Sequence, residues 1–371
     1  MSDTFIRAIG TAVLVCVGIV LLLAVAVVVV DRRNARWTRR RAELEARWRA
    51  FLIGEVPHPP PMPVTDRDRT VVLVLFNELT QEAAGPVPVP GRATVTAAGR
   101  RTRLEHVAAA LLDGDDVDKV VAFHALARLG GAAAAEAARA HLDHPGTELS
   151  RAAARCLLLI DPGALGPALD RVRRRPDWGP TRVAAMLAEI DPQALGDGLA
   201  SAIDRSAAAG DGDGTIRLLG FLSYCSPEVA RDACHRVLDL AGDSAVLAAA
   251  LRGLAEVAWP GDAAVARRHA WDTRAHVRLA AIRVLRAVGT GEDLALLGSM
   301  VTDPDYWVRR RSAEALVALG AVGVGRPPTG YLAAVDSAYA RDALVEAMAD
   351  ARFTGLDSRP TSRAIGPRVA G

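Results

Sequence analysis

The side chains that could bind a metal ion or act as nucleophiles are few and widely spaced. His141 and His144 stand three residues apart, a spacing that lets two histidines of one helix share a metal, but no third ligand is near them in the sequence. Cys225, Cys234 and His235 fit a metal site no better, because no cysteine stands in a C-x-x-C pair. We therefore expect surface histidines at a helix end and thiols buried as small apolar side chains.

Two acidic segments share only part of the pattern of a calcium-binding loop. Residues 113–118 read Asp-Gly-Asp-Asp-Val-Asp and residues 211–214 read Asp-Gly-Asp-Gly; neither has the D-x-D-x-D-G order or the distal glutamate. Both are predicted to be turns that cap helices. No G-x-S-x-G, P-loop or dinucleotide-binding motif stands in a suitable context. The sequence thus predicts no catalytic residue, no cofactor, no metal and no enzymatic activity.

Arginines gather in three short runs. Each run could contact phosphate, lipid headgroups or an acidic partner; the alternative is a solvated surface balanced by Asp and Glu. The runs are Arg171, Arg173, Arg174 and Arg175; Arg267 and Arg268; and Arg309, Arg310 and Arg311. The formal net charge of the chain is only +2, which argues against nucleic acid as the main ligand.

An uncharged stretch from Ile9 to Val30 predicts a transmembrane helix. At ~1.5 Å per residue such a helix would be ~33 Å long, enough to cross a hydrocarbon core of ~30 Å. A cleaved signal peptide is the alternative, but that requires a basic n-region, a shorter apolar core and a small-residue cleavage site. Only Arg7 is basic before the stretch, which ends in Val-Val-Val-Val-Asp-Arg-Arg. We therefore expect an uncleaved anchor.

The flank after this stretch predicts the orientation of the anchor. Residues 31–49 contain eight arginines against three acidic residues, and positive charge stays on the cytoplasmic side of a membrane. We therefore expect the large C-terminal part in the cytoplasm, at the inner (plasma) membrane of a bacterial cell.

Residues 32–52 are predicted to continue as a helix out of the bilayer. Trp37, Leu44, Trp48 and Phe51 fall on one face of it. Either this helix lies on anionic lipid, where Trp and Arg suit the headgroup zone, or it is only a stop-transfer flank. The residues expected to contact headgroups are Arg32, Arg33, Arg36, Trp37, Arg39, Arg40 and Arg41.

Composition predicts an all-α cytosolic part. Aromatic residues make up only 4% of the chain and alanine, which favours helices, is abundant. Residues 57–63 (Pro-His-Pro-Pro-Pro-Met-Pro) are predicted to be a stiff spacer. The apolar segment Thr70–Leu79 suits a buried strand or a helix, and we prefer a helix that starts an N-terminal cap. The second helix of the cap would be Arg103–Leu112.

A repeat of about 31 residues runs through the rest of the chain. Residues 277–289 and 308–320 align at their Val-Arg starts and at their glycine ends, and both place small or apolar residues at i, i+4, i+7, i+8 and i+11. This spacing is one buried face of a helix. One column of that face recurs at steps of 31, 30, 35, 32, 31 and 31 residues: Leu126, Leu157, Leu187, Leu222, Leu254, Leu285 and Leu316.

Second helical segments lie between the helices of this column. Asp-Pro and Ser-Pro pairs precede several of them, and an Asp or Ser before a Pro caps a helix N-terminus. The predicted unit is therefore two short helices per repeat.

The repeat resembles the HEAT-repeat family, in its short bacterial form. Thr302–Gly320 matches the loop aspartate, the Val-Arg helix start, the small-residue column and the Leu-Gly end of that family, and Asp272–Gly289 matches nearly as well. The resemblance covers about Asp113–Asp350. It implies a curved right-handed α-solenoid whose surface binds proteins, and it implies neither an enzyme nor a particular partner.

The middle repeats depart from the family pattern. Ser150, Pro180, Thr215 and Leu247 replace the basic residue that the two best repeats carry. Arg278 and Arg309 are those basic residues, and together with Arg310 they are the residues expected to contact a partner.

The fold class expected from these features is all-α, a HEAT-type α-solenoid preceded by a single transmembrane helix. We expect residues 1–30 to form an N-terminal tail and the membrane helix, 31–65 a basic juxtamembrane helix and Pro-rich linker, and 66–112 an N-terminal cap. Residues 113–354 would hold about seven repeats, and 355–371 a disordered tail.

The function expected is that of a membrane-anchored scaffold or adaptor that binds a protein partner at the cytosolic face of the membrane. A membrane enzyme such as a glycosyltransferase would be a natural client, and neither nucleic acid nor a small-molecule substrate is expected. The alternative is a HEAT-like enzyme that resembles either a bilin lyase or a DNA glycosylase. A lyase of that kind should be soluble, and a glycosylase should show a basic groove with aromatic residues, so the anchor and the low aromatic content count against both.

The orientation can be tested with a reporter. A reporter that is active only in the periplasm, fused after Gly371, should be silent, because the arginines after the apolar stretch hold the C-terminal part in the cytoplasm. Strong activity of this fusion would contradict the predicted topology.

Overall fold

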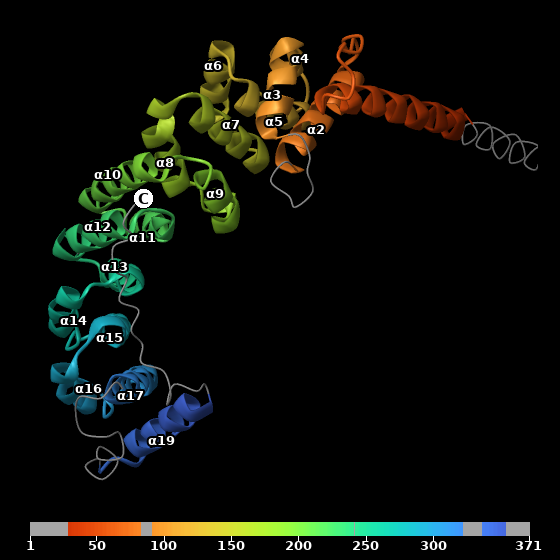
Figure 1. Ribbon diagram of the computed structural model, residues 1–371. Helices are drawn as coiled ribbons and strands as arrows, with labels where there is room; N and C mark the ends of the chain where they lie inside the picture. Colours follow the sequence, from red (N-terminus) through yellow and green to blue (C-terminus); the bar gives the residue numbers. More distant parts are fainter. Residues whose placement is uncertain (1–28, 83–90, 241, 322–335, 354–371) are drawn as a thin grey trace, which may run out of the picture. The chain divides into compact units, whose positions relative to one another are not determined.

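The computed structural model describes residues 29–82, 91–240, 242–321 and 336–353. Over these residues the chain is built of α-helices and short 3-10 turns, with no β-strand (Figure 1). The helices form two compact units, Met1–Pro162 and Gly163–Gly371. The all-α prediction is confirmed.

The first unit contains a helix over residues 29–52 and six further helices. Its core is formed by α2 packed against α3, α4 and α5, and by α7 packed against α5 and α6. The six helices are α2 (Asp66–Glu82), α3 (Arg92–Arg101), α4 (Leu104–Leu111), α5 (Asp116–Leu129), α6 (Ala132–His141) and α7 (Thr147–Ile160). The segment Thr70–Leu79 is helical within α2, as preferred, and α4 agrees with the second cap helix expected over 103–112.

The sequence analysis did not anticipate α3. Its residues, Arg-Ala-Thr-Val-Thr-Ala-Ala-Gly-Arg-Arg, have a weak helical pattern, and no side chain caps its N-terminus. Tertiary packing holds it: a Cβ atom on Gly99 would lie 2.8 Å from Cε2 of Phe76 and 3.0 Å from Cδ2 of Leu129. Only glycine lets α3 approach its neighbours this closely.

The apolar face predicted on the helix of residues 29–52 is covered by protein. Trp48 and Phe51 are buried, and their rings make an edge-to-face contact at 6.1 Å. Trp37 lies under the guanidinium of Arg67 in α2, 4.6 Å from the ring centroid. Protein therefore covers Trp48 and Phe51, and the lipid contacts expected of the arginines on this helix stay a prediction. The helix belongs to the first compact unit.

The stretch predicted to cross the membrane lies almost wholly outside the described residues, which begin at residue 29. Within the described part of the chain, no helix has the length and apolar character that crossing a bilayer requires. Residues 355–371, expected to be a disordered tail, also fall outside the described residues.

The second unit stacks its helices in two layers (Figure 1). In one layer α11, α13, α15, α17 and α19 follow one another, and in the other lie α8, α10, α12, α14 and α16. The bounds are α8 (Leu165–Arg174), α9 (Pro180–Leu187), α10 (Pro192–Ala208), α11 (Gly212–Leu219), α12 (Pro227–Leu240), α13 (Ser244–Val257), α14 (Ala263–His269), α15 (Ala275–Val288), α16 (Leu294–Met300), α17 (Tyr306–Ala321) and α19 (Ala338–Phe353). This is the two-helix repeat of a HEAT-type solenoid.

The leucine column is buried along its whole length, from Leu126 to Leu316. Its middle is less regular than expected. Leu187 is the last residue of α9, and Leu222 lies in a 3-10 turn (Leu222–Tyr224) after α11 has ended at Leu219. The step of 35 residues between them accommodates the long helix α10, so the column keeps its burial but not its helical setting.

The turn before α10 uses the cap that its Asp-Pro pair predicts, whereas before α17 the cap is Asp305 and not Asp303, the aspartate that precedes Pro304. The carboxylate of Asp191 accepts from the backbone N–H groups of Gln193 and Ala194 at the start of α10. The carboxylate of Asp305 accepts in the same way from Trp307 and Val308 at the start of α17. Each cap satisfies backbone donors that have no partner within the helix.

The stacking can be tested at the centre of the column. Leu285→Asp places a carboxylate without a partner at a fully buried position of α15 and should cost several kcal/mol of unfolding free energy. Leu240→Asp is the control, because Leu240 is 63% exposed at the end of α12. Thermal melts followed by circular dichroism should show a large loss for the first variant and little change for the second. Equal melting temperatures would contradict the repeat assignment.

Candidate protein-interaction surface

Buried aspartates connect consecutive repeats of the second unit. Asp262, in the turn before α14, accepts from both Nε and Nη2 of Arg231 in α12, at 2.9 and 2.8 Å. It also accepts from the backbone N–H of Trp259 at 2.7 Å, and the ring of His235 lies 2.8 Å from it. One repeat later, Asp293 pairs with Arg267 of α14 at 2.5 Å and accepts from the backbone N–H of Thr290. Each aspartate thus closes its own turn and holds the preceding helix.

These carboxylates are ionised in the folded protein. Burial raises the pKa of Asp262, but the hydrogen bonds from Arg231, from the backbone of Trp259 and from His235 outweigh it, so the pKa lies below the ordinary value. The same balance, with Arg267 and the backbone of Thr290 as donors, lowers the pKa of Asp293. The ion pairs therefore persist through the neutral range.

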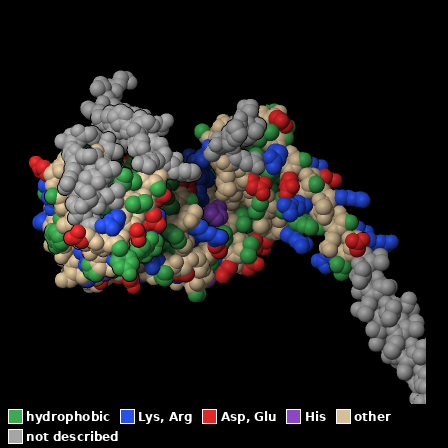
Figure 2. Space-filling model, turned by 90° about the horizontal axis from the view of Figure 1, so that it is seen from below, with side chains coloured by type: hydrophobic (Ala, Val, Ile, Leu, Met, Phe, Trp, Pro, Cys, Tyr) green, Lys and Arg blue, Asp and Glu red, His purple; other side chains and the backbone are tan. Residues whose placement is uncertain are grey.

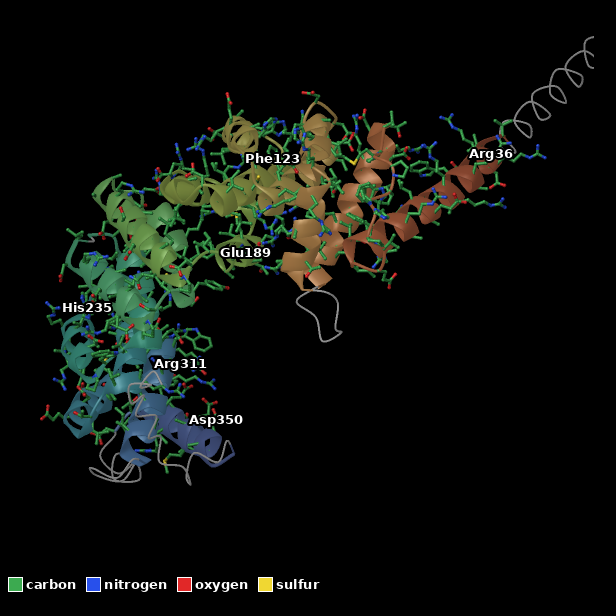
Figure 3. All side chains as sticks on the ribbon, turned by 45° about the horizontal axis from the view of Figure 1, so that its top comes forward. Arg36, Phe123, Glu189, His235, Arg311 and Asp350 are labelled. Carbon is green, nitrogen blue, oxygen red and sulfur yellow. The ribbon has the colours of Figure 1, made fainter. Side chains whose placement is uncertain are left out.

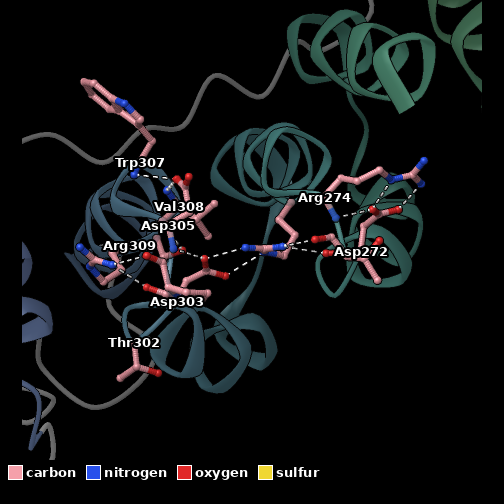
Figure 4. Close-up of polar contacts among 12 residues, drawn as sticks. Asp272, Arg274, Thr302, Asp303, Asp305, Trp307, Val308 and Arg309 are labelled. Carbon is pink, nitrogen blue, oxygen red and sulfur yellow. Dashed lines mark hydrogen bonds and ion pairs between the residues drawn. The ribbon is translucent and has the colours of Figure 1, made fainter. Parts of the chain in front are cut away.

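A second polar link runs along the layer of α15 and α17, and it includes Arg278. Nε and Nη2 of Arg278 donate to the two carboxylate oxygens of Asp303 at 2.8 and 2.7 Å (Figure 4). Nη1 of Arg278 donates to the backbone carbonyls of Asp272 and Thr273. Only 12% of the Arg278 side chain is exposed. The contacts of this predicted partner-binding residue are thus made within the fold.

Arg309 and Arg310, the other two predicted contact residues, lie at the start of α17. Nη1 of Arg309 donates to the backbone carbonyls of Asp303 and Pro304 (Figure 4). Arg310 is held by Glu314 at 3.3 Å, and Glu346 and Asp350 of α19 lie 3.8 and 3.6 Å from it. Both arginines are half-buried.

Exposed aromatic rings surround Arg309. Tyr306 and Trp307 are 47% and 54% exposed, and Tyr339, at the start of α19, is 74% exposed. The guanidinium carbon of Arg309 lies 5.9 Å from the ring centroid of Tyr306 and 5.7 Å from that of Tyr339. Trp307 makes an edge-to-face contact with Tyr306 at 5.1 Å. We call Tyr306, Trp307, Arg309 and Tyr339 the aromatic–arginine cluster.

The start of α17 turns these rings outward. The cap at Asp305 holds the first turn of the helix, and Val308 anchors that turn in the core at 0% exposure. Trp307, next to Val308 in sequence, consequently projects away from the hydrogen-bonded network (Figure 4). The sequence analysis used Tyr306 and Trp307 only as part of a turn and did not recognise them as a surface.

The other exposed Trp and Tyr side chains among the described residues, Tyr224, Trp259 and Trp271, also belong to the second unit. Of these, Trp259 lies under the guanidinium of Arg231, 5.3 Å from the ring centroid.

The residues predicted to contact lipid divide into two sets. Arg40 pairs with the buried Asp68 at 2.6 Å, Arg41 pairs with Glu45 at 2.7 Å, and Trp37 is covered by Arg67. The remaining four are exposed on the helix of residues 29–52, and the described residues offer them no ion pair: Arg32, Arg33, Arg36 and Arg39. Figure 2 shows basic side chains along this part of the helix, and Figure 3 marks Arg36 there.

The histidines and cysteines have local contacts. Nδ1 of His141 lies 2.9 Å from the carbonyl of Ala137, and Nδ1 of His144 accepts from the backbone of Gly146. Burial raises the pKa of Cys234 to about 12 and that of Cys225 to about 11, so both are protonated thiols at neutral pH. Over residues 29–82, 91–240, 242–321 and 336–353, no three His, Cys, Asp or Glu side chains converge as metal ligands would.

The acidic segments and the first arginine run are structural. Asp115 caps α5 by accepting from the backbone N–H of Asp118, and Asp211 caps α11 by accepting from that of Gly214, as predicted. Arg173 forms an ion pair with Asp211, and Arg175 pairs with Asp177 at 2.8 Å. Aspartates of the fold thus balance the charges of Arg173 and Arg175. This agrees with the alternative that the run is a solvated surface balanced by acidic residues.

The comparisons with known proteins agree with the repeat. Residues 235–318 match the family model described as HEAT repeats, and repeats of this kind typically mediate protein binding. No match was found among curated proteins. Among solved structures, an engineered protein from the Northeast Structural Genomics Consortium is similar over 83% of this chain and 98% of its own, at 15% identity and a TM-score of 0.32. A likeness at this level carries no functional information.

The buried link at Asp262 can be tested by removing its charge. Asp262→Asn should lower the unfolding free energy by roughly 2 kcal/mol at neutral pH, because Arg231 loses its buried counter-ion. Asp239→Asn, at an exposed position of α12, is the matched control and should leave stability unchanged.

The effect should depend on pH. The pKa of Asp262 is lower in the folded than in the unfolded protein, so its contribution is complete above the unfolded pKa of about 3.9 and is lost as pH falls through the folded value. Melts in this acid range should therefore show the wild type and Asp262→Asn converging. A difference that stays constant below pH 4 would contradict the ionised link.

Proposed function

We propose that this chain is a membrane-anchored HEAT-repeat scaffold that binds a protein partner through the second unit. The observation that carries the proposal is the aromatic–arginine cluster: Tyr306, Trp307 and Tyr339 are exposed around Arg309, whose guanidinium is held by backbone carbonyls. We propose that this unit acts as a binding surface without catalysis of its own.

The chemistry of the cluster favours a protein ligand. Tyr, Trp and Arg are the residue types that contribute most to interface hot spots, because they bury large area and form hydrogen bonds. The hydrogen bonds of Arg309 and the N-terminal cap of α17 hold the cluster in place, so binding would cost little conformational entropy. Ring–guanidinium contacts at 5.7 and 5.9 Å orient the groups further.

The membrane part of the proposal rests on the sequence and on the basic helix. The stretch Ile9–Val30 has the length of a bilayer span, and Arg32, Arg33, Arg36 and Arg39 follow it on an exposed helix. This helix contacts α2 through Trp37, which lies under Arg67, and through Arg40, which pairs with Asp68. The proposed location is the cytoplasmic face of the inner membrane.

A HEAT-like enzyme of the lyase or glycosylase kind is the competing function. A substrate turned over by the purified chain would establish it and remove the scaffold proposal. Nothing in the described contacts favours it over binding.

Partner capture from solubilised membranes tests the scaffold. We expect the full-length protein to retain a partner, and Trp307→Ser combined with Tyr339→Ser to weaken that retention about tenfold or more, because both rings are exposed and their loss removes contact area without opening the core. Tyr224→Ser removes a ring that is 42% exposed elsewhere in the unit and serves as the control. Capture that is the same for all three proteins would contradict binding through the cluster.

A further inference from the structure

Arg278 and Arg309 occupy equivalent positions in consecutive repeats, and half of their contacts are the same. In both, Nη1 donates to the backbone carbonyls six and five residues earlier in the chain: Asp272 and Thr273 for Arg278, Asp303 and Pro304 for Arg309. These two hydrogen bonds hold the guanidinium of each arginine against the turn that precedes its own helix.

The other half of the contacts differs. Nε and Nη2 of Arg278 hold the carboxylate of Asp303, which the next repeat supplies. The residue 31 positions after Asp303 is Ala334, and the first acidic residue that follows it in the sequence is Asp336. Among the residues that the structure describes, no carboxylate forms an ion pair with Arg309; its neighbours there are the rings of Tyr306 and Tyr339.

The surrounding charges leave this position cationic. Glu314, Glu346 and Asp350, the acidic groups of α17 and α19 that come near, are engaged with Arg310. The carboxylate of Asp305 caps the helix. A planar guanidinium with two parallel donors on one edge matches a carboxylate better than any other common protein group.

We propose that Arg309 binds a carboxylate supplied by the partner, from an Asp or Glu in an acidic peptide segment, with Tyr306, Trp307 and Tyr339 packing around it. The ligand takes the place that Asp303 takes on Arg278. This inference rests on the proposed scaffold function, because the partner supplies the carboxylate. It adds the chemistry of the ligand and the residue that recognises it.

The test uses a peptide that copies the turn accepted by Arg278. The probe is fluorescein-labelled Gly-Ser-Thr-Asp-Pro-Asp-Tyr-Gly-Ser, and its counterpart has Asn in place of both Asp residues. Binding to the purified full-length protein in detergent is followed by fluorescence anisotropy. We expect the acidic probe to bind and the Asn counterpart to bind about tenfold or more weakly, since charge-assisted hydrogen bonds are lost.

Variants identify the group that binds. Arg309→Lys keeps the positive charge but loses the paired donors, and it should weaken the acidic probe by about tenfold. Tyr339→Ala, at a position 74% exposed, should weaken it severalfold with an unchanged melting temperature. Arg268→Lys, at an exposed position of α14, is the control and should bind like the wild type.

Three outcomes would overturn the proposal. They are an absence of binding by the wild type, equal binding of the two peptides, and equal binding by Arg309→Lys.

Failure of the scaffold function can be distinguished from failure of the carboxylate site. Cluster-dependent capture of a partner together with peptide binding that ignores Arg309 would retain the scaffold and remove the carboxylate site. Arg309-dependent peptide binding without any captured partner would retain the carboxylate site and remove the scaffold function.

Discussion

A two-helix repeat cannot bury its own apolar stripe, and this constraint determines the rest of the structure. Leu254, Leu285 and Leu316 are fully buried because α13, α15 and α17 pack against one another and against the helices of the second layer. Stability in such an array accumulates from neighbour to neighbour. Each turn must therefore return the chain to the correct distance for the next stripe, and the polar residues of the turns perform that task.

The buried aspartates satisfy two requirements of those turns at once. A turn that lies between packed helices leaves backbone N–H groups without partners, and an unpaired buried donor is costly. Asp262 and Asp293 accept from those groups, and the arginine of the preceding helix neutralises the charge that this creates. The pairing is specific in distance and direction, so it sets the spacing of repeats that apolar packing alone would leave free to slide.

Sequence periodicity predicted the features that depend on one helix face and missed those that depend on what covers it. The leucine column, the helix over Thr70–Leu79 and the cap at Asp191 follow from local pattern and were correct. For Trp48 and Phe51 the pattern identified an apolar face, but a lipid surface and α2 satisfy such a face equally well. Helix α3 has little pattern because its position depends on the contact of Gly99 with Phe76.

The candidate surface was only partly predictable for the same reason. The Val-Arg pair at the start of two helices pointed to Arg278 and Arg309 as equivalent residues. Their sequence motif does not reveal that Arg278 pairs with Asp303 from the next repeat and that Arg309 stands beside Tyr339 of α19. Within the described residues, Arg309 keeps the backbone hydrogen bonds of this motif but forms no ion pair with a carboxylate. The end of the array therefore differs chemically from its interior although the local sequence is the same, and specificity can arise there without any new motif.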